Sequence, residues 1–351
     1  MKQKIVISEN IKHDLGYLLS DEEYDKLFIL VDVCTKTKCL PLISGIKELE
    51  QAEIITIEEG DDNKNLQTLS KVWHELCEKG ATRKSCIINL GGGMVTDLGG
   101  FASSTFKRGI RFINIPTTLL AMVDASVGGK TGINFNGLKN EIGCFSNAED
   151  VIISTKFLQT LDERNICSGY AEMIKHGLIS DEGTWGELML FDIANPNLSE
   201  LGKMVGKSIN IKERFINADP QEHGIRKALN FGHTAGHAFE ELSLKNGTPL
   251  PHGYAVAFGM VCELYLSCIK LGFPTKKMRQ TVGYIKEHYG FGSFKLTCDE
   301  YKILISLMKH DKKNVSGIIN FTLLEDIGQL RINQTASNEE IVEAFDFLRE
   351  C

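Results

Sequence analysis

Residues 86–93 read CIINLGGG, a short apolar run with β-branched side chains that ends in three glycines. Such a run, bounded by turn residues, is typical of a buried β-strand. Similar runs lie elsewhere in the first half of the chain: KLFILVDV near residue 30, EIITIEEG near 55, RFINIPTT near 113 and VIIS near 152. From Leu66 to Cys77 apolar residues recur at helical spacing, and the pattern stops at Gly80. Alternating strands and helices predict a parallel sheet with crossover helices.

The second half of the chain has a different period. After Leu161 the helical patterns are long and strand signals are few, apart from a pair around GIINFTLLEDIG at 317–328. We therefore expect an α/β domain over residues 1–161 and a mainly α-helical domain over 162–351. A length of 351 residues, about twice that of a usual single domain, agrees with this division. Ligand sites favour the interfaces between domains.

Composition excludes several classes of function. The hydrophobic content of 42% and charged content of 24% are ordinary for a globular protein, and a net charge of -7 argues against general nucleic-acid binding. The ten cysteines are scattered, as in a protein of the reducing cytoplasm. No apolar stretch has the length of a membrane span, and the first residues, MKQKIVISEN, lack the apolar core of a signal peptide. We expect a cytoplasmic protein with a small-molecule partner and no membrane partner.

The glycines after CIINL favour a nucleotide site. A strand that ends in a tight glycine turn before a helix lets backbone amides hold a diphosphate, as in Rossmann-like folds. The dinucleotide fingerprint is incomplete, however, because its third glycine would fall at Thr96. An ordinary turn therefore remains an equal alternative at this point.

A second glycine-rich segment, DASVGGKTG at 124–132, is not a Walker A loop, since the first glycine of that motif would have to lie at Asp124. It supplies an acid, Asp124, and a cation, Lys130, and Lys139 and Asn140 follow. These residues suit either a polar ligand or a solvated flexible loop.

Residues 230–260 hold three of the nine histidines, His233, His237 and His252. His233 and His237 are four residues apart in a helical pattern, so their rings project from one face. Neutral imidazoles together with a carboxylate suit Zn²⁺ or a similar ion, and three protein ligands make a catalytic site. The apolar segment SGYAEMIKHGLIS offers Glu172, followed by Lys175 and His176 on the same helical face. Spacing leaves open whether His176 or His237 is a ligand.

Cations and amides extend this polar surface. Lys212 shares a helical stripe with apolar residues, and a lysine on such a face either extends its amine to water or meets an anion. Arg226 and Asn230 lie one turn apart, just before His233. Together they predict an anionic, hydroxyl-bearing ligand beside the metal.

At these residues the chain resembles the 3-dehydroquinate synthase family of sugar-phosphate cyclases. The resemblance covers nearly the whole chain through motifs that occur in order: GGGMVTDLGGF, STFKRG, PTTLLAMVDASVGGKTGIN, GLKNEIGCF, GYAEMIKHG, LNFGHTAGHAFE, HGYAVAFGM and DKK. It implies a Rossmann-like N-terminal domain, a helical C-terminal domain, NAD with Zn²⁺ or Co²⁺ as cofactors, and a homodimer.

The resemblance also implies a role for each residue of the site. The metal ligands would be Glu172, His233 and His252, and His237 would handle protons beside them. The positions implied for NAD binding are Asp32, Asp61, Lys64, Gly92, Gly93, Met94, Val95, Thr96, Asp97, Thr117, Thr118, Lys130, Lys139, Phe157 and Thr160. Those implied for the substrate are Asp124, Lys130, Asn140, Lys175, Lys212, Arg226, Asn230 and the pair Lys312 and Lys313, with Arg108 reaching into the neighbouring subunit.

Two positions depart from the family pattern. Family members usually have glutamate at the position of Asp61 and glycine at that of Thr96. Both lie among the residues expected to bind NAD, so the departures bear on the affinity or pose of the cofactor more than on the chemistry.

The reaction that the resemblance implies converts 3-deoxy-D-arabino-heptulosonate 7-phosphate, a small phosphorylated sugar acid, into 3-dehydroquinate and phosphate. It combines transient oxidation by NAD, phosphate elimination, re-reduction, ring opening and aldol closure. A cyclase that makes inosose or valiolone compounds, a metal-dependent NAD alcohol dehydrogenase and a non-catalytic binding protein are the alternatives. Lys212, Arg226, Asn230 and His237 follow the dehydroquinate pattern.

Overall fold

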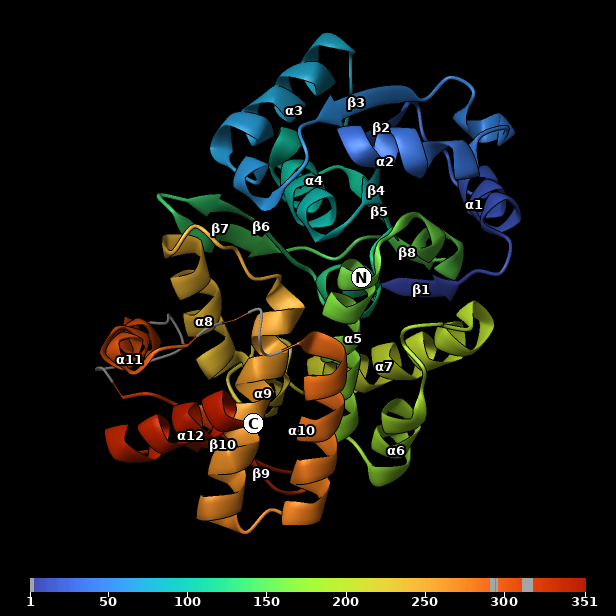
Figure 1. Ribbon diagram of the computed structural model, residues 1–351. Helices are drawn as coiled ribbons and strands as arrows, with labels where there is room; N and C mark the ends of the chain where they lie inside the picture. Colours follow the sequence, from blue (N-terminus) through green and yellow to red (C-terminus); the bar gives the residue numbers. More distant parts are fainter. Residues whose placement is uncertain (1–2, 291–293, 295, 311–317) are drawn as a thin grey trace. The chain divides into compact units, whose positions relative to one another are not determined.

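The computed structural model describes residues 3–290, 294, 296–310 and 318–351 (Figure 1). Contacts between Cα atoms divide the chain into two compact units, Met1–Asp162 with Asn197–Ile209, and Glu163–Pro196 with Asn210–Cys351. The expected division into 1–161 and 162–351 differs from these units at Asp162 and over residues 197–209, the latter because helix α7 (Leu198–Ala218) runs through both of them.

The first unit is built on a six-stranded parallel sheet with the order β1-β8-β5-β4-β2-β3. The five apolar runs of the sequence form five of these strands, which confirms the expected α/β fold. The strands are β1 (Lys4–Ile7), β2 (Leu27–Asp32), β3 (Glu53–Ile57), β4 (Cys86–Gly91), β5 (Arg111–Pro116) and β8 (Asp150–Ile153). Strands β4 and β8 are buried throughout, as a sheet covered on both faces requires.

Helices connect and cover these strands, as crossover connections require. The helices are α1 (Ile11–Ser20), α2 (Val33–Lys38), α3 (Leu66–Glu78) and α4 (Gly93–Thr105). Helix α3 begins and ends close to the limits expected from its apolar spacing, and it buries Leu69, Val72 and Leu76. Shorter helical turns link the elements: η1 (Leu40–Ile43), η2 (Lys47–Leu49), η3 (Asp61–Asn63), η4 (Phe106–Arg108), the π-turn η5 (Ala121–Ala125) and η6 (Thr155–Thr160).

The first unit also contains an antiparallel ribbon, β6 (Lys130–Phe135) and β7 (Leu138–Phe145), where the sequence left a solvated loop as one alternative. The turn between its strands is Asn136–Gly137, and both residues have positive φ (50° and 80°). Asn-Gly with two positive φ angles is the signal of a tight hairpin turn. Lys130 therefore begins a strand, and Lys139 and Asn140 lie on its partner.

The second unit is mainly helical, as expected. Its helices are α5 (Glu163–Leu178), α6 (Glu182–Leu190), the end of α7, η7 (Ile225–Asn230), α8 (His233–Lys245), α9 (His252–Leu271), α10 (Thr275–Tyr289), η9 (Cys298–Glu300), α11 (Tyr301–His310) and α12 (Asn338–Glu350). The strand pair expected near residue 320 is the antiparallel hairpin β9 (Phe321–Asp326) and β10 (Gln329–Gln334).

Helix α9 is the centre of the second unit, where it contacts α5, α8, α10 and α12 (Figure 1). Within the described residues it is the one helix long and apolar enough to span a membrane by length and composition. Its most apolar window is 67% buried inside the protein, as in the core helix of a folded unit.

Candidate functional site

Several of the residues expected to bind NAD lie where strands of the parallel sheet end. Asp32 ends β2, Gly91 ends β4, and Thr117 follows the end of β5. The chain runs from β2 outward to β3 and then returns to place β4 on the other side of β2, so the sheet order reverses between β2 and β4. Ligands of open parallel sheets bind at the carboxyl ends of the strands at such a reversal.

Glycine geometry brings helix α4 close to this edge. Gly92 is the N-cap of α4, and a Cβ there would lie 3.1 Å from the Thr118 side chain. A Cβ on Gly91 would lie 2.5 Å from Val95. The first turn of α4, Gly93 to Thr96, thus starts directly from the strand end with its amides and positive dipole end toward the edge, which suits a diphosphate.

Thr96, one of the two departures from the family pattern, is buried (1% exposed). Its hydroxyl donates a hydrogen bond to the carbonyl of Gly93, 3.1 Å away, within its own helix. The side chain is therefore accommodated inside α4. Asp61, the other departure, lies 3.1 Å from the Lys139 amine and accepts a hydrogen bond from Asn134.

Lys64 is a buried cation next to the same helix. Its Nζ donates to Asp97 Oδ2 and to Asn140 Oδ1, each at 2.5 Å. Burial raises the pKa of the Asp97 carboxyl, and Lys64 opposes that change. Lys64, Asp97 and Asn140 thus form one network, which joins a residue expected to contact substrate to two expected to contact NAD.

The remaining candidates of the first unit are placed as follows. Met94 and Val95 lie in the first turn of α4, Phe157 and Thr160 lie in η6 after β8, Asp124 lies in η5, and the exposed Arg108 ends η4 with a positive φ of 69°.

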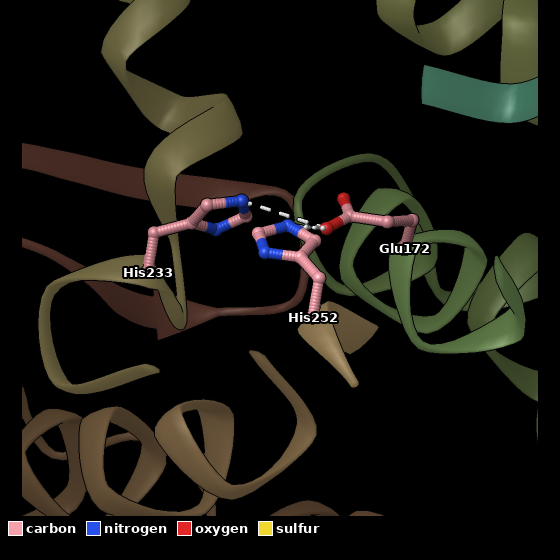
Figure 2. A group of neighbouring side chains, drawn as sticks. All are labelled: Glu172, His233 and His252. Carbon is pink, nitrogen blue, oxygen red and sulfur yellow. Dashed lines mark ion pairs between the residues drawn. The ribbon is translucent and has the colours of Figure 1, made fainter. Parts of the chain in front are cut away.

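In the second unit, Glu172, His233 and His252 converge (Figure 2). Their ligand atoms lie within 4.8 Å of one another. The Nε2 atoms of His233 and His252 are each 3.5 Å from Glu172 Oε1. Each residue comes from a different helix: Glu172 from the middle of α5, His233 and His252 from the first positions of α8 and α9.

Close backbone contacts make this convergence possible. A Cβ on Gly253 would lie 1.8 Å from the carbonyl oxygen of Ser168, and the Gly253 N–H donates to the Ser168 hydroxyl. Glycine thus lets the start of α9 touch α5 one turn before Glu172. Gly232, the N-cap of α8, has a positive φ of 79°, and a Cβ there would meet Met260 at 2.5 Å. These contacts bring both histidines to the carboxylate.

The residues present fit a divalent cation. Glu172 Oε1 is buried and has no hydrogen-bond partner among the described residues, although two imidazole nitrogens face it. A tetrahedral ion with bonds of about 2.0–2.1 Å holds its ligand atoms roughly 3.3–3.4 Å apart. The 3.5 Å separations are close to that value.

The charges around Glu172 hold it ionised. Burial alone would raise the pKa of its carboxyl, but the ammonium of Lys175 and the imidazoles of His233 and His252 bring it well below the usual value. Lys175 donates to the other carboxylate oxygen, Oε2, so that Oε1 faces the histidines. Burial alone would lower the pKa of His252, but Glu240 and Glu172 raise it to about 10.

His237 lies beside these imidazoles, with ring centroids 5.3 Å from His233 and 6.0 Å from His252. His176, the alternative that spacing left open, is fully buried on α5, one turn after Glu172. Glu172, His233 and His252 form one group with His237 next to it, and a His176 nitrogen also lies within 4.8 Å of a Glu172 carboxylate oxygen.

The cationic candidates of the second unit are buried. Lys212 is 6% exposed and Arg226 is 2% exposed. Arg226 donates through Nη1 to the carbonyl of Pro220, and Asn230 donates to Glu222 Oε1 at 2.8 Å. The polar surface expected from sequence thus includes Glu222. Lys312 and Lys313 lie outside the described residues.

Two buried glutamates escaped the sequence reasoning. Glu240 on α8 is 5% exposed and accepts from His252, and Glu263 on α9 is fully buried. Glu263 accepts from the backbone N–H groups of Gly232 (2.7 Å) and Thr234 (3.0 Å), which caps the start of α8. For Glu263 the signal was a single acid in an apolar helix, the same kind that identified Lys212, whereas Glu240 is followed by a second acid, Glu241, and gave no such signal.

Solved structures that share this fold include two synthases, and reductases and alcohol dehydrogenases match it with lower TM-scores. A 2-epi-5-epi-valiolone synthase from Streptomyces hygroscopicus, with NAD+ and Zn²⁺ bound, matches with a TM-score of 0.85 over 100% of this chain and 97% of its own, at 21% identity. A 2-deoxy-scyllo-inosose synthase complexed with carbaglucose-6-phosphate, NAD+ and Co²⁺ matches with a TM-score of 0.84 over 99% and 96%, at 22% identity. At this identity the likeness shows the fold.

Sequence relatives define the family. The profile of the 3-dehydroquinate synthase N-terminal region matches residues 54–168, and that of the C-terminal region matches residues 169–314. A 3-dehydroquinate synthase from Parabacteroides distasonis is 56% identical over 349 residues, which cover 99% of this chain and 98% of the relative. The chain belongs to the 3-dehydroquinate synthase family, as its motifs predicted.

Proposed function

We propose that this protein is an enzyme that converts 3-deoxy-D-arabino-heptulosonate 7-phosphate into 3-dehydroquinate and phosphate, a step toward aromatic amino acids. The observation that carries the proposal is the 56% identity to a 3-dehydroquinate synthase over almost the full length of both chains. The enzyme is a carbon–oxygen lyase that eliminates phosphate and closes a carbocycle. Residues 1–161 are the proposed NAD-binding part, and residues 162–351 the proposed metal- and substrate-binding part.

The cofactors in this proposal are NAD and Zn²⁺ or Co²⁺. When bound, NAD accepts and returns a hydride, and the divalent ion lowers the pKa of a substrate hydroxyl. Asp32 and the first turn of α4 hold the dinucleotide at the edge of the sheet. Glu172, His233 and His252 hold the ion. This role is supported by the 3.5 Å from each Nε2 to Glu172 Oε1, an atom with no hydrogen-bond partner in the described part of the chain.

The remaining polar residues bind and orient the substrate. Lys175, Lys212 and Arg226 hold its carboxylate and hydroxyls through charge-assisted hydrogen bonds. Lys130, Asn140, Asn230, Arg108 and one of the lysines 312 and 313 hold the phosphate, which serves as its own base in the elimination, so that the protein's task is positioning. Asp124 contributes a further polar contact.

His237 moves the proton that leaves the reacting hydroxyl. Its ring lies within 5.3–6.0 Å of the two metal-binding imidazoles, near the site but in a position separate from the ligand set. A neutral imidazole can accept a proton near neutral pH and return it later in the cycle.

Phosphate release from the heptulosonate phosphate, measured with and without chelator, tests the function. We expect release that requires both NAD and metal, with no net NADH at the end. Net accumulation of NADH would indicate an alcohol dehydrogenase, and absence of turnover with this substrate but turnover of another sugar phosphate would indicate a different cyclase. Either result would refute the proposal.

The proposed assembly is a cytoplasmic homodimer, in which Arg108 contributes to the neighbouring subunit's site. Mixing an Arg108→Ala variant with a second variant that is inactive through Lys212→Met would test this arrangement. Recovery of part of the activity on mixing supports a shared site. A mixture that stays inactive, together with a monomeric mass in solution, contradicts it.

A further inference from the structure

The contact between Glu240 and His252 assigns a role to a residue outside the set above. Glu240 lies seven residues after His233 on α8, so it shares a face with His233 and His237. Its Oε2 lies 3.1 Å from His252 Nδ1, and the side chain is almost fully buried. A buried carboxylate is costly unless it is paired, so its placement against one imidazole nitrogen needs a reason.

The two nitrogens of His252 face two different carboxylates. Nδ1 faces Glu240, and Nε2 faces Glu172 Oε1 at 3.5 Å. An ionised carboxylate only accepts hydrogen bonds, so Nδ1 must carry the proton that is shared with Glu240. The lone pair of the neutral ring is then on Nε2, the nitrogen that points to the other ligands.

In His233 a backbone carbonyl, rather than a carboxylate, fixes the tautomer of the ring. Its Nδ1 lies 3.1 Å from the carbonyl oxygen of Phe231, which also selects the Nδ1–H form and leaves Nε2 toward Glu172. His252 follows Pro251, the N-cap of α9, and its Nδ1 partner comes from another helix. Glu240 therefore does for His252 what a local carbonyl does for His233.

The segment between α8 and α9 is fixed to the same part of α8. The Ser243 hydroxyl donates to the backbone carbonyl of Glu240 and accepts from the N–H of Leu250, at 2.7 and 2.9 Å. Leu250 lies two residues before His252. The position of the carboxylate and that of the ring are thus set by one short network.

We propose that Glu240 is a positioning residue for the metal centre: it fixes the ring orientation and tautomer of His252 and thereby raises the affinity for the divalent ion. This inference rests on the proposed metal site. Carboxylates or carbonyls that hold metal-bound histidines typically contribute 10- to 100-fold in metal affinity.

The test compares Zn²⁺ affinity, measured by competition with a chromophoric chelator, in the wild type, Glu240→Gln and Glu240→Ala. Alanine removes the acceptor, so we expect an affinity about 100-fold weaker; the amide oxygen of glutamine still accepts, so we expect a loss of about tenfold. The absorption spectrum of the Co²⁺ form should change in both variants, strongly in Glu240→Ala, where no acceptor holds the ring, and less in Glu240→Gln, where a neutral acceptor replaces the carboxylate.

The matched control is Glu241→Gln. Glu241 is the next residue of α8, exposed, and paired with Lys245 at 2.9 Å. We expect it to bind Zn²⁺ as the wild type does. Glu240→Gln with wild-type affinity and an unchanged Co²⁺ spectrum would overturn the inference, whether or not Glu240→Ala folds. A wild type that binds no Zn²⁺ would overturn the proposed metal site itself, which keeps the two failures distinct.

Discussion

The contact between Gly253 and Ser168 predicts that one methyl group can disrupt the proposed metal site. In Gly253→Ala the new Cβ would lie 1.8 Å from a backbone carbonyl oxygen, which no rotation of a side chain can relieve. Ordinary van der Waals contact begins near 3.4 Å, so α5 and the start of α9 would have to separate by about 1.6 Å. His252 directly precedes Gly253 and would move with it.

A displacement of about 1.6 Å is several times the roughly 0.2 Å tolerance of metal–ligand distances. We therefore expect Zn²⁺ affinity to fall by more than about 100-fold, beyond the 10- to 100-fold typical for loss of a group that only supports a ligand. Overpacking of a closely packed interior also costs about 1–3 kcal/mol of stability. The thermal midpoint of the apoprotein should fall accordingly.

The assay is Zn²⁺ competition together with thermal unfolding of the apoprotein, with Gly283→Ala as control. Gly283 lies in the middle of α10, and a Cβ there meets nothing within 4 Å in the described part of the chain. We expect the control to keep its affinity and to gain up to about 1 kcal/mol from better helix propensity. Wild-type affinity and midpoint in Gly253→Ala would refute the packing argument.

Three further perturbations follow from buried charges. Lys212→Met should lower kcat/KM about ten- to 150-fold, roughly 1.5–3 kcal/mol for one charged hydrogen bond, and leave Zn²⁺ content unchanged; full turnover would contradict the role of Lys212. Glu263→Gln places an amide donor against the N–H groups that start α8 and should cost about 1.5–3 kcal/mol in denaturant unfolding, whereas Glu241→Gln should cost almost nothing. Because the pKa of His252 is about 10 in the metal-free protein, Zn²⁺ binding at pH 7–8 should release about one proton from it, and apparent affinity should rise as pH rises toward 10; calorimetric heats that do not depend on the ionisation enthalpy of the buffer would contradict this.

The sheet could be predicted from sequence because its strands are buried on both faces and read as continuous apolar runs. β4 is buried at every position, and β2 at every position but its first. β1 escaped notice because it has four residues, lies at the sheet edge and is only partly buried. Strand β7 of the ribbon β6–β7 is largely exposed, so its sequence has no alternation of apolar and polar residues. Only Asn136–Gly137 marked the turn.

The candidate site divides in the same way. The sequence itself offered three histidines and the carboxylate of Glu172, but spacing left open whether His176 or His237 is a ligand. Only the resemblance to the family gave the set Glu172, His233 and His252. The structure adds the physical reason: Gly253 and Gly232 allow backbone contacts that no side chain would permit. Such contacts join segments distant in sequence, and a glycine alone does not name its neighbour.

Glu263 and Lys212 show why a single charge in an apolar helix has more than one meaning. Both are charged residues at buried positions, whereas most buried positions of the sequence are apolar. Such exceptions are often found at functional sites. Glu263 meets backbone amides at the start of α8, so it supports the fold of the site. Lys212 is proposed to meet the substrate. The two roles differ only in what each charged side chain contacts, and the sequence alone does not give that contact. For this reason we expect Glu263→Gln to lower stability and Lys212→Met to lower turnover.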